Sequence, residues 1–181
     1  MGKFYEQLNE TLSEFIAEQK LFFVASTPAD GRVNLSPKGI NTLRVLNQRQ
    51  VAYLDLTGSG NETAAHLYQN GRLTMMFCSF GRKPVILRLY GQGRAIQPRH
   101  QEWAGLAMQL PSVPGVRQIM LLNIESVQTS CGFWVPLFEY QGERETLVKW
   151  AEHEGEEELA AYRETKNQCS IDGLPTHILI D

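Results

Sequence analysis

The chain has 181 residues and a formal net charge of −3, from 17 Lys and Arg against 20 Asp and Glu. That length fits one domain with a sizeable core, and this charge balance favours neither a nucleic acid nor an anionic membrane as partner. Three widely separated cysteines and the lack of a secretory leader pattern lead us to expect a cytoplasmic protein without disulfides. All apolar stretches fall short of the roughly 20 residues of a membrane helix.

The first elements are predicted to be a helix and an antiparallel hairpin. Apolar residues recur at helical spacing over residues 3–19, which predicts an amphipathic helix. Residues 21–26 form an apolar run typical of a buried strand, and residues 32–36 alternate between apolar and polar side chains. A proline and an Asp-Gly pair between these two strands favour a tight turn. The Pro-Lys-Gly segment at residues 37–39 is expected to bend or end the second strand.

The most informative stretch is VAYLDLTGSGNETAAHL, residues 51–67. It is typical of a buried strand, a glycine-rich turn and the start of a helix. Ser59 and Glu62 match a capping box, in which two side chains satisfy the first free N–H groups of a helix. A helix that starts directly after a strand concentrates N–H groups and positive potential, so this turn can hold a phosphate. The alternative is a turn that only connects two elements, and the carboxylate of Glu62 counts against an anion.

The rest of the chain is predicted to contain three strands, one helix between the second and the third of them, and two helices after the last. Because most strands are joined by short turns, an antiparallel barrel with peripheral helices, mainly β in class, is favoured over a parallel α/β sheet. We expect one domain over residues 1–181, in which residues 143–181 form a helical extension packed on the barrel or on a partner subunit. The predicted strands span residues 73–80, 85–96 and 118–129, and the predicted helices start at Pro98 and span residues 143–153 and 156–166.

The order of five segments along the chain resembles the pyridoxamine 5′-phosphate oxidase-like superfamily, and in particular its branch of oxidase-related FMN-binding proteins. The segments are FFVAS, GRVNLSPKG, VAYLDLTGSGNETAAHL, NGRLTMMF and LRLYGQGRA, and the resemblance covers residues 4–142. Members of the branch also carry a tail similar to KNQCSIDGLP. The resemblance implies an FMN-binding split β-barrel, antiparallel and of Greek-key type, which works as a homodimer with FMN in the groove between subunits.

The resemblance also implies which residues border the cofactor. The second strand of the hairpin is expected to run along the flavin, the next strand to border it, and the glycine turn to hold its phosphate. Trp134 is either a cover for the flavin edge across the dimer or a core aromatic. Lys38 is either a positive charge in the groove or a solvated hairpin lysine. The implied cofactor-binding residues are Ser36, Pro37, Lys38, Gly39, Ile40, Leu56, Thr57, Asn61, Glu62, Thr63 and Trp134.

The sequence departs from the family pattern at the phosphate. Characterised oxidases have an Arg-Lys pair where this chain has Glu62 and Thr63, and a lysine where it has Asn41. Arg and Lys bind phosphate through charge-assisted hydrogen bonds, which are roughly twice as strong as neutral ones. Losing two of them would cost on the order of 3 kcal/mol, or roughly a hundredfold in affinity. We therefore expect FMN to bind with moderate affinity.

The segment with which the true oxidases grip pyridoxal phosphate is not recognisable in this chain. The expected function is therefore an FMN-dependent oxidoreductase acting on a small conjugated or heteroaromatic compound, and not on pyridoxamine phosphate. No catalytic residue is assigned. The alternative is a non-catalytic dimeric module that binds a flavin, a deazaflavin or haem.

Other chemistries have less support in the sequence. The glycine turn lacks the Gly-Lys-Ser/Thr of a P-loop, and Ser59 is flanked as GSG rather than in the GxSxG of a nucleophile elbow. The four histidines show no metal-ligand spacing. His66 is expected to be a surface or capping residue, and Arg88 to lie on the barrel exterior.

Overall fold

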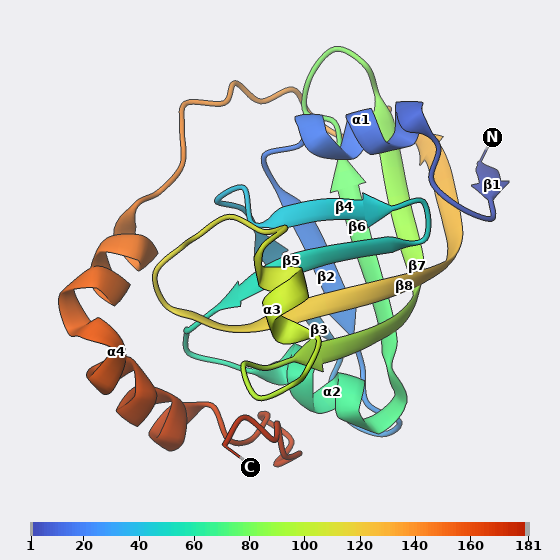
Figure 1. Ribbon diagram of the computed structural model, residues 1–181. Coiled ribbons are helices and arrows are strands. Elements are labelled where there is room, and N and C mark those ends of the chain that lie inside the picture. The colour runs from blue at the N-terminus through green and yellow to red at the C-terminus, as the bar shows by residue number, and fades with distance from the viewer. Residues whose placement is uncertain (1, 180–181) are drawn as a thin grey trace.

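The structure is a computed structural model that describes residues 2–179 (Figure 1). Its centre is an eight-stranded antiparallel sheet with the order β3-β2-β6-β7-β8-β5-β4, and β1 pairs beside β8. The two ends of this order, β3 and β4, do not pair with each other within the described residues, so the curled sheet is a split barrel. The strands are β1 (Lys3–Tyr5), β2 (Phe22–Ser26), β3 (Asn34–Lys38), β4 (Leu43–Asn47), β5 (Gln50–Leu56), β6 (Arg72–Cys78), β7 (Val85–Ile96) and β8 (Val116–Cys131).

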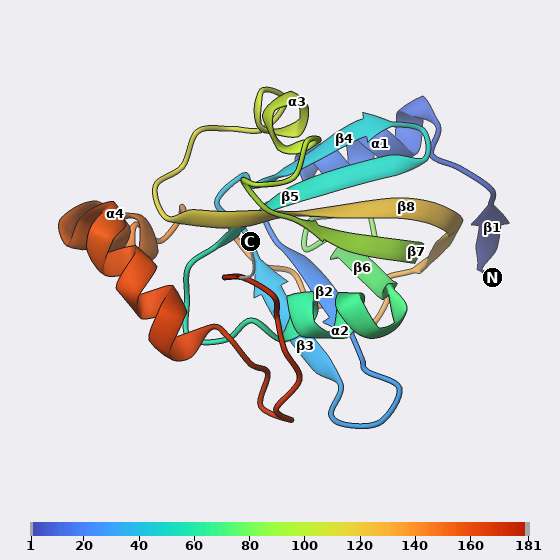
Figure 2. The same ribbon diagram turned by 60° about the horizontal axis from the view of Figure 1, so that its bottom comes forward.

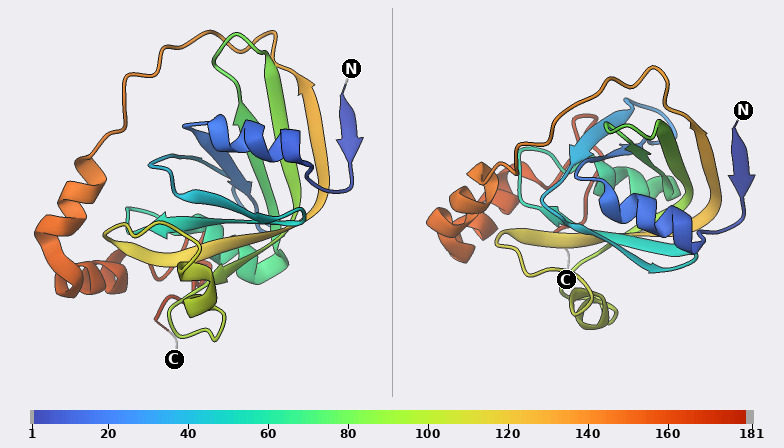
Figure 3. Two further views of the ribbon diagram at one scale, coloured as in Figure 1. Left: turned by 45° about the horizontal axis from the view of Figure 1, so that its top comes forward. Right: turned by 90° about the horizontal axis from the view of Figure 1, so that it is seen from above.

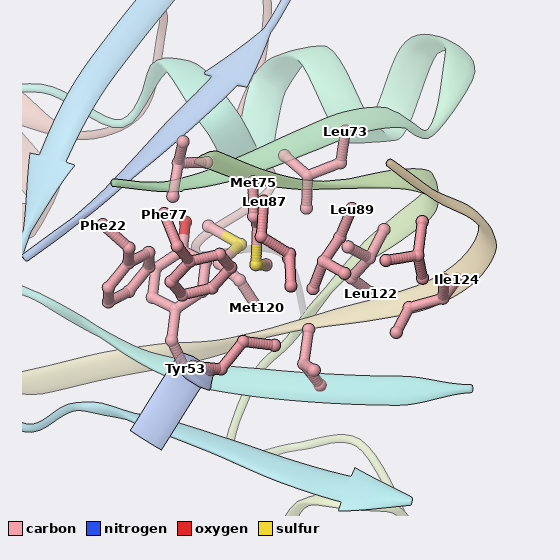
Figure 4. Close-up of a cluster of buried hydrophobic side chains, with 14 of the residues drawn as sticks. Phe22, Tyr53, Leu73, Met75, Phe77, Leu87, Leu89, Met120, Leu122 and Ile124 are labelled. Atoms are coloured by element: carbon pink, nitrogen blue, oxygen red, sulfur yellow. The ribbon is translucent and has the colours of Figure 1, made fainter. Parts of the chain in front are cut away.

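The main core fills the inside of the curled sheet (Figure 4). Phe22 and Phe77 stack there with their ring centroids 5.7 Å apart, and Tyr53 meets Phe22 edge to face. Helices α1 (Glu10–Glu18) and α2 (Glu62–Asn70) close the two ends of the barrel (Figure 1). Both helices turn apolar side chains into this core, and α2 packs against β2, β6 and β7.

A second apolar cluster covers the outer face of β5 and β8. The short helix α3 (Trp103–Ala107) packs there with residues of the loops around it. The long strands β7 and β8 change register at Gly91, where a Cβ atom would overlap the carbonyl oxygen of Asn123. Only glycine permits that close approach of the two backbones.

The carboxyl-terminal part runs around the barrel and returns to it. Residues 132–145 cross from the end of β8 to α4 (Thr146–Lys166), which lies outside the sheet (Figures 1 and 3). Gly155, with φ 76° and ψ 170°, breaks α4 into two helices. The tail after α4 then comes back toward α2 and the β2–β3 hairpin (Figure 2). None of the helices within residues 2–179 is long and apolar enough to cross a membrane.

Most predicted elements are confirmed: the hairpin, the central strand, the helix that follows it, the three later strands and the two helices around Gly155. The single helix predicted over residues 3–19 is wrong. Asn9 caps α1 by accepting a hydrogen bond from the N–H of Leu12 at 2.9 Å, and residues 3–5 pair with β8 instead. The helix predicted from Pro98 is only the five-residue α3, and β4 was not predicted.

Candidate functional site

A cavity of about 470 Å³ opens between the β3 edge, the end of β5 and the start of α2. That volume is within the range of small-molecule sites, roughly 300–1,000 Å³. The predicted cofactor-binding residues line it, except Thr57 and Trp134. Thr57 is buried behind the wall, where its N–H and hydroxyl donate to the carbonyl oxygen of Gly115. Trp134 is 99% exposed on residues 132–145, so the interpretation as a core aromatic is wrong for this chain.

A strained turn forms one wall of the cavity. Ile40 and Asn41 have φ angles of 58° and 52°, and the N–H of Thr42 donates to the carbonyl oxygen of Gly39 at 3.3 Å. Two successive positive φ angles define a type I′ turn, which a β-branched residue such as Ile40 adopts at a cost in conformational energy. Two side chains hold this turn in place. The Thr42 hydroxyl donates to the carbonyl oxygen of Gly39, and the Glu143 carboxylate accepts from the N–H of Ile40.

Two cations share one buried carboxylate at the floor of the cavity. Nε of Arg117 lies 2.8 Å from Oδ2 of Asp55, and Nζ of Lys38 lies 3.3 Å from Oδ1. Burial acts to raise the pKa of Asp55, but Arg117, Lys38 and the hydrogen bonds from Arg117 and Gln118 outweigh it and lower the pKa to about 2. The carboxylate is therefore ionised. Because Arg117 already neutralises it, the charge of Lys38, whose side chain is 26% exposed, is only partly compensated.

Lys38 is thus a residue of the cavity wall, and its interpretation as a solvated hairpin lysine is wrong. Arg117, in contrast, could not be predicted as a residue of the site. The sequence marks it only weakly, as a single charged residue at the start of a largely apolar strand. Asp55 is a similar single charge within β5. The antiparallel pairing places Asp55 opposite Gln118, next to Arg117, and so brings the two charges together.

Two side chains of the glycine turn, residues 58–63, are already engaged. Asn61 is buried: its Oδ1 accepts from Gln118 at 2.7 Å and its Nδ2 donates to the carbonyl oxygen of Asn167 at 3.2 Å. Thr63 accepts from Nδ2 of Asn34 at 3.2 Å. The backbone donors of the turn remain free, because the N–H groups of residues 59–63 have no acceptor within residues 2–179.

The predicted capping box of Ser59 and Glu62 is wrong. Asn61 is the N-cap of α2, without a side-chain capping bond, and Glu62 is the first residue of the helix. Both carboxylate oxygens of Glu62 accept from the N–H of Ile171 in the tail, each at 3.1 Å. The carboxylate therefore binds the tail, but Glu62 still lines the cavity, so its negative charge continues to count against an anion at the turn.

His66 lies away from the cavity and is not a surface or capping residue. It is 1% exposed, its Nδ1 is 3.0 Å from the hydroxyl of Ser26, and its Nε2 is buried without a partner in the described chain. Burial lowers the pKa of His66, against the opposing effect of Glu62. Within residues 2–179 there is also no cluster of His, Cys, Asp or Glu that could hold a metal ion.

Comparison with known proteins agrees with the architecture. The family profile of pyridoxamine 5′-phosphate oxidase matches residues 8–131. The pyridoxamine 5′-phosphate oxidase family protein ustO of Aspergillus flavus is 42% identical over 193 residues, which cover 97% of this chain and 78% of that protein. This chain belongs to the pyridoxamine 5′-phosphate oxidase family. The resemblance predicted from the sequence is confirmed, and the ustO match extends it over the carboxyl-terminal extension.

Solved structures of low sequence identity show the same fold. A putative pyridoxamine 5′-phosphate oxidase from Lactobacillus delbrueckii has a TM-score of 0.55 at 19% identity, covering 68% of this chain and 94% of that one. The FAD binding protein from Mycobacterium smegmatis has a TM-score of 0.51 at 12% identity, covering 70% of this chain and 97% of that one. The haem storage protein HutZ from Vibrio cholerae has a TM-score of 0.50 at 18% identity, covering 70% of this chain and 98% of that one. These matches confirm the predicted split barrel.

We predict that His66 makes stability depend on pH. Because its pKa is lower in the folded than in the unfolded chain, the folded state binds its proton less readily. The stability is full above the ordinary pKa of 6.5 and falls as the pH decreases below it. Urea unfolding between pH 7 and pH 5 measures the slope, which should be smaller in His66→Gln. The exposed His153→Gln is the control and should keep the wild-type slope; an unchanged slope in His66→Gln would contradict the prediction.

Proposed function

We propose that this chain binds FMN in the cavity between β3, β5 and α2, and that the flavin makes it an oxidoreductase for a small conjugated or heteroaromatic compound. The observation that carries the proposal is the juxtaposition of Lys38, only partly neutralised, with the free N–H groups of residues 59–63. A cation beside unpaired donors at a helix start is the chemistry that a phosphate group requires. The family implies the same cofactor.

Two features of the turn support binding of a phosphate there. The free N–H groups lie at the start of α2, a nine-residue helix whose dipole adds positive potential there. The carboxylate of Glu62 already accepts the N–H of Ile171, so it does not compete for those donors. The contribution of Lys38 is one charge where characterised oxidases have a basic pair, which supports moderate rather than tight binding.

The rest of the wall suits a flat aromatic ring. Pro37, Ile40, Leu54, Leu56 and Leu147 supply apolar surface beside the polar turn. When bound, flavin would supply the electron-transfer chemistry, and the chain would bind it, orient it and exclude water. The turn at Ile40, held by hydrogen bonds to Thr42 and Glu143, belongs to the wall along which the ring is proposed to lie.

Haem is the second candidate, because HutZ is a haem storage protein of the same fold. Haem iron is usually held by His, Cys, Met or Tyr. Among the described residues that line the cavity, none is of these four types. The Mycobacterium smegmatis relative in fold is an FAD binding protein, which adds support for a flavin.

The proposal predicts that FMN binding depends on Lys38. Lys38→Gln should weaken FMN about tenfold, equivalent to roughly 1.4 kcal/mol, because one charge-assisted hydrogen bond to the phosphate is lost. Riboflavin, which has no phosphate, should change less than about threefold. Flavin fluorescence during titration measures both affinities, and Lys20→Gln, an exposed lysine outside this cavity, is the control. Binding of neither flavin by the wild type would contradict the proposal.

We propose further that pyridoxamine phosphate is not the substrate. Lys38 and Arg117 are the cations among the described residues of the cavity wall, and all three guanidinium nitrogens of Arg117 are engaged with protein acceptors. One available lysine does not serve the phosphate of FMN and that of a substrate together. We expect the FMN-loaded protein to form no hydrogen peroxide from pyridoxamine 5′-phosphate in a peroxidase-coupled assay. Formation at a rate proportional to protein concentration would contradict this.

We also propose that the chain forms a homodimer that encloses the flavin. Large apolar side chains are exposed on residues 132–145 and near the β3 edge, where a monomer would leave them in water: Phe133, Trp134, Leu137, Phe138, Val33 and Leu35. In a dimer, Trp134 would then be available to cover a flavin edge in the other subunit. Light scattering should give a mass of about 41 kDa, twice 20.5 kDa. A monomer at micromolar concentration would contradict the proposal.

A further inference from the structure

The glycine turn is held from behind by two side-chain donors that contact its carbonyl oxygens. Nδ2 of Asn167 donates to the carbonyl oxygen of Gly58 at 2.9 Å. Nη2 of Arg117 donates to the carbonyl oxygen of Gly60 at 2.6 Å. Neither interaction serves the turn's own secondary structure, because both donors come from distant parts of the chain.

These contacts fix the direction of the next N–H groups. The peptide bonds of the described residues are all trans, and in a trans peptide the N–H points opposite to the carbonyl oxygen. The N–H groups of Ser59 and Asn61 therefore point away from Asn167 and Arg117. Both are among the N–H groups without an acceptor in residues 2–179, and both residues line the cavity.

A donor on a carbonyl oxygen also polarises its peptide group. Hydrogen bonds in a chain strengthen one another, and bonds from a charged donor are the stronger ones. The guanidinium of Arg117 thus makes the N–H of Asn61 a better donor, although the guanidinium itself is buried. Backbone N–H groups in a turn can form a concave anion site.

Arg117 and Asn167 hold each other in place. Nη1 of Arg117 donates to Oδ1 of Asn167 at 2.8 Å, while Nε is paired with Asp55. The backbone oxygen of Asn167 accepts from the hydroxyl of Thr176 at 2.6 Å, and Asn167 is completely buried. Arg163, at the end of α4, donates to the hydroxyl of Thr57 at 2.9 Å and fixes the first residue of the turn.

We propose that Arg117 and Asn167 are positioning residues for the phosphate of the flavin, and that they convert the glycine turn into an anion site from behind. The inference rests on the proposed function, and it goes beyond it by assigning a role to the carboxyl-terminal extension. Asn167 lies outside the family match over residues 8–131. In place of the Arg-Lys pair of characterised oxidases, the charge of Arg117 acts through the peptide group between Gly60 and Asn61.

The experiment compares FMN with riboflavin, because only a phosphate-directed effect changes the ratio of their affinities. Asn167→Ala removes the donor to Gly58 and one acceptor of Arg117. We expect the affinity for FMN to fall about tenfold and the affinity for riboflavin to fall less than threefold. Asn167→Asp keeps the acceptor for Arg117 but adds a negative charge behind the turn. Its affinity for FMN should therefore fall at least as much as that of Asn167→Ala.

Arg99→Ala is the matched control. Arg99 donates to the carbonyl oxygen of His177 at 2.6 Å and so also fastens the tail to the barrel, but it does not contact the glycine turn. This variant should keep the wild-type ratio of FMN to riboflavin affinity. Circular dichroism and thermal unfolding of each variant show that the fold is retained.

The outcomes separate the inference from the proposed function. If the wild type binds neither flavin, both are overturned. If the wild type prefers FMN and the Asn167 variants keep that preference, only the inference is overturned. The same holds if their affinities for FMN and riboflavin fall by the same factor. Where the Asn167 variants fail to fold, Arg117→Lys decides: a lysine keeps the charge but cannot reach Asp55, Asn167 and Gly60 together, so the preference for FMN should fall. An unchanged preference in that variant would overturn the inference.

Discussion

The site depends on the buried ion pair between Asp55 and Arg117. Removing two charges from water is expensive, and a buried pair is tolerated only where further hydrogen bonds satisfy the remaining donors and acceptors. Here those bonds extend outward: Asp55 also accepts from Lys38 and Gln118, while Arg117 reaches Asn167 and Gly60. The pair therefore connects two strands, the glycine turn and the tail, which are far apart in sequence. Loss of either partner would disturb all of them at once.

The barrel could be predicted because its signals are local. Each strand is marked by its own apolar pattern, and the order of the segments is typical of the family. The residues of the cavity followed from that resemblance: β3 is one edge of the open sheet and β5 pairs with β4, the strand at the other end, and residues of β3 and β5 line the same cavity. The errors at the amino terminus had a physical reason as well: Phe4 continues the helical spacing of α1 but belongs to a strand paired with β8.

The polar interior of the site could not be predicted, because its partners are remote in sequence. Arg117 and Asn167 are 50 residues apart, and Asn61 and Asn167 are 106 apart. Glu62 illustrates the consequence. From the sequence its carboxylate could only be paired with a nearby Ser59, whereas in the structure it accepts an N–H from Ile171, 109 residues away. His66 has the same explanation, since its burial depends on packing against β2. Local pattern specifies the elements, and long-range hydrogen bonds specify which polar groups remain free.

In the proposed role of Arg117, the free-energy cost of ordering a cation for the phosphate arises on folding rather than on ligand binding. An exposed arginine or lysine that contacts a phosphate directly gives a strong bond, but its side chain must be ordered when the ligand binds. Arg117 is already fixed by three partners, so its ordering and desolvation are costs of folding, and the turn is preorganised before the ligand arrives. The charge then acts across one peptide group, which weakens it relative to direct contact. Moderate affinity follows from both effects. Because Asn167 belongs to the tail, the same arrangement makes docking of the extension a condition for recognising the phosphate, a dependence that a pair of basic residues on the barrel itself would not have.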